Sequence, residues 1–76
     1  MNINDMKMKE NISWNIRKHR LKKRISRREL SERSKVSENV LKFVENDLSY
    51  DIKIENLVKL AEALEINLED LVSENG

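Results

Sequence analysis

The stretch that decides the fold runs from Ser26 to Asp47 and reads SRRELSERSKVSENVLKFVEND. Ser26 is followed three residues later by Glu29, which is the pattern of a helix N-cap with a capping box. Ser37 offers a second N-cap a short distance along the chain. We therefore predict two short helices joined by a tight turn, with arginines at the entrance of the first helix.

Apolar residues at helical spacing predict three more helices around this pair. The first should run from about Asn11 to Lys23, a fourth from Ile52 or Lys53 to about Glu65, and a fifth should start after Asn67. The expected core positions are Ile12, Ile16, Leu30, Val36, Val40, Leu41, Val44, Ile54, Leu57, Leu60, Ala61, Leu64, Ile66, Leu68, Leu71 and Val72.

The chain of 76 residues is long enough for one domain, and it has no Pro and a single, terminal Gly. We therefore predict an all-α fold of five short helices. Residues 1–10 are expected to form an N-terminal arm, disordered or at a dimer interface, followed by a helical domain over 11–73 and a tail over 74–76.

Composition excludes several classes of protein. The chain has no Cys, and none of its apolar runs approaches the roughly 20 residues that span a bilayer. Its N-terminus also lacks the apolar core of a signal peptide. We therefore expect a cytoplasmic protein without a membrane partner. His19 is the only histidine and has no metal-ligating neighbour at suitable spacing. With no Gly-rich phosphate loop either, neither an enzyme nor a metal or cofactor site is expected.

The net charge of +1 hides an uneven distribution. Residues 1–36 carry 12 Lys and Arg against 4 Asp and Glu, and residues 37–76 carry 3 against 10. Eight basic residues fall between Arg17 and Arg28, next to the helix pair. Such a run can be a solvated helix face, or it can face a polyanion such as double-stranded DNA.

From Ile12 to Val72 the chain resembles the phage-repressor/Cro-like (XRE-type) helix-turn-helix regulators. The matching positions share one register and are Ile16, Arg17, Arg20, Ile25, Ser26, Glu29, Leu30, Val36, Ser37, Leu41, Val44, Glu45, Asn46, Leu57, Lys59, Leu60, Ala61, Ala63, Leu64, Leu68, Glu69, Asp70 and Leu71. The resemblance implies a compact, lambda-repressor-like five-helix DNA-binding domain with the helix-turn-helix at helices two and three. It also implies a homodimer on a palindromic operator.

The resemblance implies a role for each of several residues. Base reading falls to the exposed face of the third helix, at Glu38, Asn39, Lys42 and Phe43. Phosphate contacts fall to Arg27, Arg28, Ser37, Asn46 and Lys53. Arg20 and Glu45 match a structural ion pair. Glu38 can instead stabilise the start of its helix, and Phe43 can instead pack on the core or on a second subunit.

The chain departs from the family pattern where glycines are usual, at Arg24, Lys35 and Asp47, and where a proline is usual, at Ile52. If Lys35 is left-handed, the strain is about 1 kcal/mol. These substitutions predict slightly different turns and a less standard pose of the third helix.

Two functions fit these residues. The first is a DNA-binding transcriptional regulator, most simply a dimeric repressor, whose dimer surface includes Leu68, Leu71, Val72, Trp14 and the N-terminal arm. The second is a protein-interaction module, such as an antitoxin or antirepressor-like partner, favoured by Glu38 and Phe43 on the reading face. A regulatory protein partner is compatible with either.

Overall fold

The computed structural model describes residues 5–74, which form five α-helices and no strand. The prediction of an all-α, five-helix fold is thereby confirmed. The first helix, α1 (Met6–Lys22), begins five residues earlier than we expected. The reason is an N-cap that the apolar spacing does not show, because the Asp5 carboxylate accepts hydrogen bonds from the backbone N–H groups of Lys7 and Met8. Residues 6–10 therefore belong to the helix and not to an arm, and residues 1–4 lie outside the described part.

The next two helices, α2 (Arg27–Ser34) and α3 (Glu38–Asn46), start directly after the predicted N-caps. Ser26 Oγ accepts from Glu29 N at 3.0 Å and Ser37 Oγ accepts from Val40 N at 3.1 Å, so each serine caps its helix as predicted. Between the helices, Lys35 takes the left-handed conformation with φ of 66°. The turn thus keeps the backbone shape that a glycine would give it.

The last two helices are α4 (Ile54–Leu64) and α5 (Leu68–Val72). Ile52, expected near the start of α4, lies in the preceding loop and is buried. A reciprocal capping box between Asn67 and Asp70 starts α5. A helix of 5 residues is marginal by itself, and this box adds local support to what packing on the domain provides.

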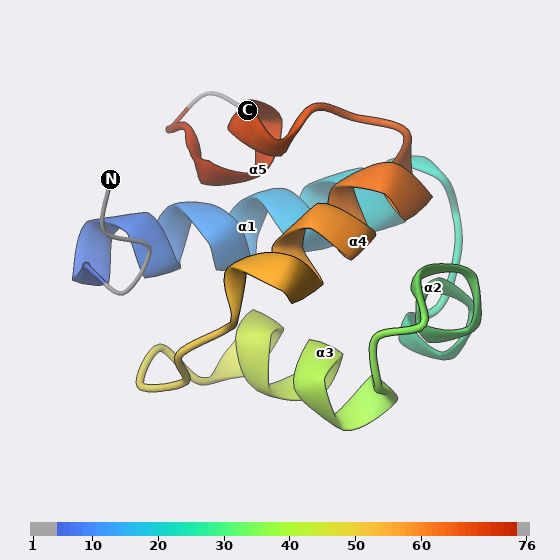
Figure 1. Cartoon of the computed structure of the whole chain (residues 1–76), viewed down its shortest axis with the longest axis horizontal. Helices are drawn as coiled ribbons and strands as arrows, with labels where there is room; N and C mark the ends of the chain where they lie inside the picture. Colours follow the sequence, from blue (N-terminus) through green and yellow to red (C-terminus); the bar gives the residue numbers. More distant parts are fainter. Residues whose placement is uncertain (1–4, 75–76) are drawn as a thin grey trace.

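Figure 1 shows α1 running through the middle of the domain, with α5 on one side of it, α3 on the other and α4 in front. The core between them is made of aliphatic side chains, namely Ile12, Ile16, Ile25, Leu30, Val36, Leu41, Val44, Ile52, Leu57, Leu60, Ala61, Leu64, Leu71 and Val72. The expected core positions Val40, Ile66 and Leu68 are only half-buried at its edge, and Ile54 is exposed.

Two asparagines of α1 hold the end of α5. Asn15 Nδ2 donates to the carbonyl oxygens of Leu71 and Ser73 at 3.0 and 2.7 Å, and Asn11 Nδ2 donates to that of Val72 at 3.2 Å. These bonds satisfy carbonyl groups that every helix leaves open at its C-terminus. They also draw Leu71 and Val72 into the core. Our prediction that these two residues lie on a dimer surface is therefore wrong.

Candidate nucleic-acid interface

The helix pair α2–α3 is held to α1 by a buried ion pair. Arg20 donates from Nε to Glu45 Oε2 and from Nη2 to Glu45 Oε1, each at 3.0 Å, and its Nη1 donates to the carbonyl oxygen of Ile25 at 3.0 Å. The Glu45 side chain is fully buried. Arg20 and Glu45, which the family resemblance matched to an ion pair, thus join α1, α3 and the loop before α2.

Arg27 is tied to the same carboxylate. Its Nε donates to Glu45 Oε1 at 3.4 Å, while a third of the side chain stays exposed. The bond orients the guanidinium at the entrance of α2 and occupies Nε only, so the terminal nitrogens can still donate to an anion. Glu45 therefore fixes both the position of α3 and the direction of Arg27.

An open depression lies between the entrance of α2 and the first turns of α3. It is lined by Arg27, Ser37, Glu38, Asn39 and Lys42. All except Arg27 are exposed. The structure thus brings five of the nine predicted DNA-binding residues together, with a guanidinium, an ammonium, an amide, a hydroxyl and a carboxylate side by side. This is a mixture of donors and acceptors that can meet both phosphates and base edges.

Four predicted residues lie outside this depression. Arg28 is exposed on α2 and pairs with Glu32 one turn later, at 3.5 Å. Asn46 and Lys53 lie at the far end of α3 and at the start of α4, and the Asn46 amide donates back to the Lys42 carbonyl oxygen at 3.0 Å. Phe43 is also exposed and lies farther along α3. Asn46 and Lys53 therefore lie away from the depression.

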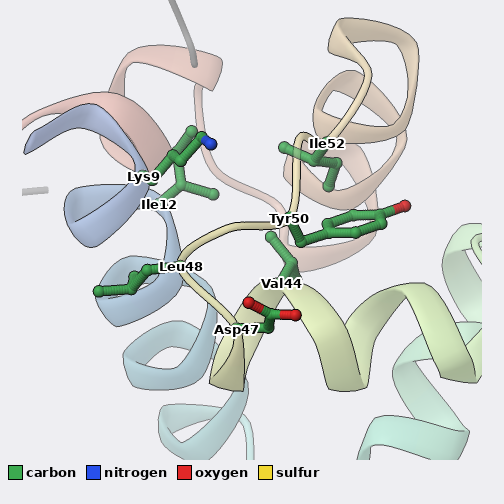
Figure 2. A pocket seen from close by; sticks show the side chains of 7 residues that line it. All are labelled: Lys9, Ile12, Val44, Asp47, Leu48, Tyr50 and Ile52. Atoms are coloured by element: carbon green, nitrogen blue, oxygen red, sulfur yellow. The ribbon is translucent and has the colours of Figure 1, made fainter. Parts of the chain in front are cut away.

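Phe43 has a partner that the sequence analysis missed. Its ring stacks on that of Tyr50, with centroids 5.6 Å apart and an angle of 22° between the planes. The tyrosine belongs to the loop after α3, which crosses toward α4 (Figure 2). A spacing of seven residues across a loop carries no periodic signal, so nothing in the sequence linked the two rings.

The same loop is anchored on α1. Ile52 is buried, and the Lys9 ammonium contacts the Asp51 carboxylate. Figure 2 shows Ile52 with Ile12 and Val44 around a small pocket, which has room for no more than about one water molecule. The loop is therefore a firm support for the Tyr50 ring and not a ligand site.

The acidic residues of this loop are partly engaged. Asp47 accepts hydrogen bonds from the side chain and the backbone N–H of Ser49. The side-chain bond, followed by the backbone bond, lowers the pKa of Asp47 below its ordinary value. Asp47 therefore carries a full negative charge near the C-terminal end of α3, where it repels phosphate, whereas the positive charge of Arg27 lies at the N-terminal end.

The side chains that line the depression thus come from the first turns of α2 and α3. Within residues 5–74 no group of three or more His, Cys, Asp and Glu side chains is placed to hold a metal ion. No helix in this part of the chain has the length and apolar character needed to cross a membrane.

Comparison with known proteins agrees with this geometry. The family profile described as Helix-turn-helix matches residues 16–71, which begin in α1 and end in α5. No curated protein and no solved structure matches the chain. The matched range covers most of the 76 residues and contains both helices of the reading pair. The chain therefore belongs to the XRE-type helix-turn-helix family, a family of DNA-binding transcription regulators and not of enzymes.

Proposed function

We propose that the protein is a sequence-specific repressor that binds a palindromic operator as a homodimer. The observation that carries this proposal is the depression between α2 and α3, in which Arg27, Ser37, Glu38, Asn39 and Lys42 converge. A family member needs a phosphate-binding edge and a base-reading edge in one rigid unit. The depression supplies both.

The phosphate edge is the entrance of α2. Arg27 is directed there by Glu45, and the first turn of any helix presents unpaired N–H groups that favour an anion. Ser37 Oγ uses its lone pair to cap α3 and keeps its hydroxyl proton for a phosphate oxygen. Together these groups set the register of α3 on the duplex.

The base edge is the first turns of α3. Asn39 can bind adenine through N6 and N7, Lys42 can donate to guanine, and Glu38 can accept from cytosine N4. Each such contact contributes about 1–3 kcal/mol of discrimination between bases. A dimer doubles this set across a palindrome, and bound protein on a promoter blocks the polymerase sterically.

Selection from a pool of random duplexes at near-physiological salt tests the proposal. We expect enrichment of a palindrome whose half-site centres lie about 10 base pairs apart. Asn39→Ala should relax the selected base at one position of each half-site. Arg28→Gln should leave the selected sequence unchanged and lower the slope of log affinity against log salt concentration by about 1. The control is Lys59→Gln, on the exposed face of α4, which should leave that slope unchanged.

The competing function is a protein-interaction module, which the exposed Phe43 and the acidic Glu38 favour. Under that function the pool yields no enriched sequence, and only weak, strongly salt-dependent binding remains. Arg27→Gln with Arg28→Gln would then leave partner binding intact. Under the repressor function, the same double substitution abolishes operator binding.

A further inference from the structure

The outer face of α1 carries three large apolar side chains that stay more than half exposed. Met6, Trp14 and Leu21 are 55%, 65% and 56% exposed. Because successive residues of a helix turn by about 100°, spacings of eight and seven place all three within about 80° of one another. They form a single stripe along the helix, opposite the buried residues Ile12 and Ile16.

Three exposed large apolar residues on one face, among them the only tryptophan of the chain, are unusual for a surface helix. Exposed single apolar residues need no explanation, but tryptophan is the residue type most enriched at the energetic centres of protein interfaces. The stripe borders a hollow that Trp14 and Leu21 line with Arg17, Lys18 and Lys22. An apolar centre with a charged rim is the usual anatomy of a binding surface.

The charges on this face identify the partner. Glu10 and Arg17 lie on the same stripe, both are exposed, and neither forms an ion pair with another described residue. They stand on either side of Trp14, which is the midpoint of α1. The face therefore carries an acid on one side of its centre and a base on the other, which makes it complementary to itself when reversed.

We propose that a second copy of the chain covers this face, with the two α1 helices antiparallel and related by a two-fold axis at Trp14. This inference rests on the proposed homodimeric function and specifies its interface. The axis brings Trp14 against its own copy, Met6 next to Leu21 of the other copy, and Glu10 next to Arg17 of the other copy. Each of these unlike contacts occurs twice, as an isologous interface requires.

The parallel arrangement is excluded by the same residues. It would set Glu10 against Glu10 and Arg17 against Arg17, so that like charges meet. The antiparallel arrangement is also compatible with DNA binding. Since α3 lies beside α1 (Figure 1), a two-fold axis directed across α1 toward α3 keeps the α3 helices of both copies on one side. A palindromic operator needs them there.

The sole tryptophan makes the dimer directly observable. As the protein concentration rises, Trp14 emission should shift to shorter wavelength. The concentration at the midpoint of this shift should equal the midpoint of dimer formation measured by sedimentation. Trp14→Ala should raise the dissociation constant at least about tenfold. The matched control is Ile54→Ala, an exposed apolar residue of α4, which should leave the constant unchanged. Arg17→Glu should weaken the dimer, and adding Glu10→Arg in the same chain should restore it.

Engineered cysteines test the direction of the helices, since the chain has none of its own. With a rise of about 1.5 Å per residue, the two copies of position 21 lie about 22 Å apart in the antiparallel dimer and side by side in a parallel one. A chain carrying both Met6→Cys and Leu21→Cys should therefore form interchain disulfides, and Leu21→Cys alone should not.

Several results would overturn the inference. They are a monomer whose Trp14 emission is constant at all concentrations, a dimer that Trp14→Ala leaves intact, and efficient linkage through Leu21→Cys alone. A monomer with constant Trp14 emission would mean that a different protein covers this face. If a palindrome is selected while Trp14→Ala binds it with unchanged affinity and cooperativity, this interface is wrong and the repressor function stands. If the α1 dimer forms and no DNA sequence is enriched, the repressor function is wrong and the interface stands.

Discussion

Removing either member of the buried Arg20–Glu45 pair should cost far more than removing both. Arg20→Met strands a carboxylate whose side chain is fully buried, with only the longer 3.4 Å bond from Arg27 left to it. Glu45→Met strands the Arg20 guanidinium, which is 10% exposed. An uncompensated buried charge costs about 3–5 kcal/mol. A domain of 76 residues has a total stability of about 4–11 kcal/mol, so each single variant should lose a large share of it.

The double variant Arg20→Met with Glu45→Met removes both charges at once. Its remaining cost is the Ile25 carbonyl oxygen, which loses the bond from Arg20 Nη1, and an unsatisfied buried acceptor costs about 1–3 kcal/mol. We therefore expect the double variant to be more stable than either single variant, with a coupling energy of at least about 3 kcal/mol.

Urea denaturation followed by far-ultraviolet circular dichroism measures the three free energies of unfolding. The matched control is the surface pair Arg33–Glu29, which is shorter, at 2.6 Å, but about half exposed. Arg33→Met should cost under about 1 kcal/mol, because burial and not distance decides the cost. Additive effects of the two core substitutions, or a core cost no larger than the surface cost, would refute the reasoning.

Three further predictions follow from particular residues. Lys35→Gly should raise the free energy of unfolding by about 0.5–1 kcal/mol in urea denaturation, because it relieves a φ of 66°, whereas Lys35→Ala should give no gain. The hydrogen bond from Lys23, and then its charge, lower the pKa of Glu65 in the folded protein. This carboxylate therefore adds stability at pH values above its ordinary pKa near 4.5, and the added stability is lost as the pH falls through the lowered pKa of the folded protein. Glu65→Gln should therefore lower the urea midpoint at pH 7 and leave it unchanged well below pH 4. If Phe43 contacts a thymine methyl, replacing that thymine by uracil should weaken wild-type operator binding about fourfold and leave Phe43→Ala binding unchanged, as measured by titration of labelled duplexes.

The helix pair was predictable because its signals are local. Ser26 and Ser37 each cap a helix by bonding a backbone N–H three residues away, and such bonds depend on neighbouring residues alone. The core of α4 followed in the same way from apolar residues at helical spacing. These elements determine where α2 and α3 start, and hence which side chains line the candidate interface.

The rest depended on contacts between distant residues. Helical spacing predicted Leu71 and Val72 in the core, but the same apolar residues were also placed on a dimer surface; the structure buries both, and bonds from Asn11 and Asn15 of α1 hold the end of their helix. Tyr50 reaches Phe43 because Ile52 anchors its loop in the core. Sequence spacing could not exclude a second role for Leu71 and Val72, and it contains no link between Tyr50 and Phe43, so the dimer surface was misassigned in part and the aromatic pair was missed.

The turn substitutions show how the reading unit tolerates the loss of family glycines. Arg24 and Lys35 adopt left-handed backbones with φ of 57° and 66°, so the turns keep their shape at a cost of about 1–2 kcal/mol each. Asp47 instead takes an extended conformation with φ of −126°, which any residue can adopt, so its substitution changes the turn without strain.

The difference between the strained turns around α2 and the unstrained turn after α3 affects how α3 is held. Glu45 receives Arg20 from α1 and Arg27 from the entrance of α2, and Arg20 also binds the Ile25 carbonyl oxygen in the strained turn before α2. Loss of that carboxylate removes the ion pair that ties α3 to α1, and it also removes the bond that orients Arg27. The fold and the phosphate edge therefore depend on one side chain. Conservative substitution at Glu45 should impair DNA binding even in conditions where the domain stays folded.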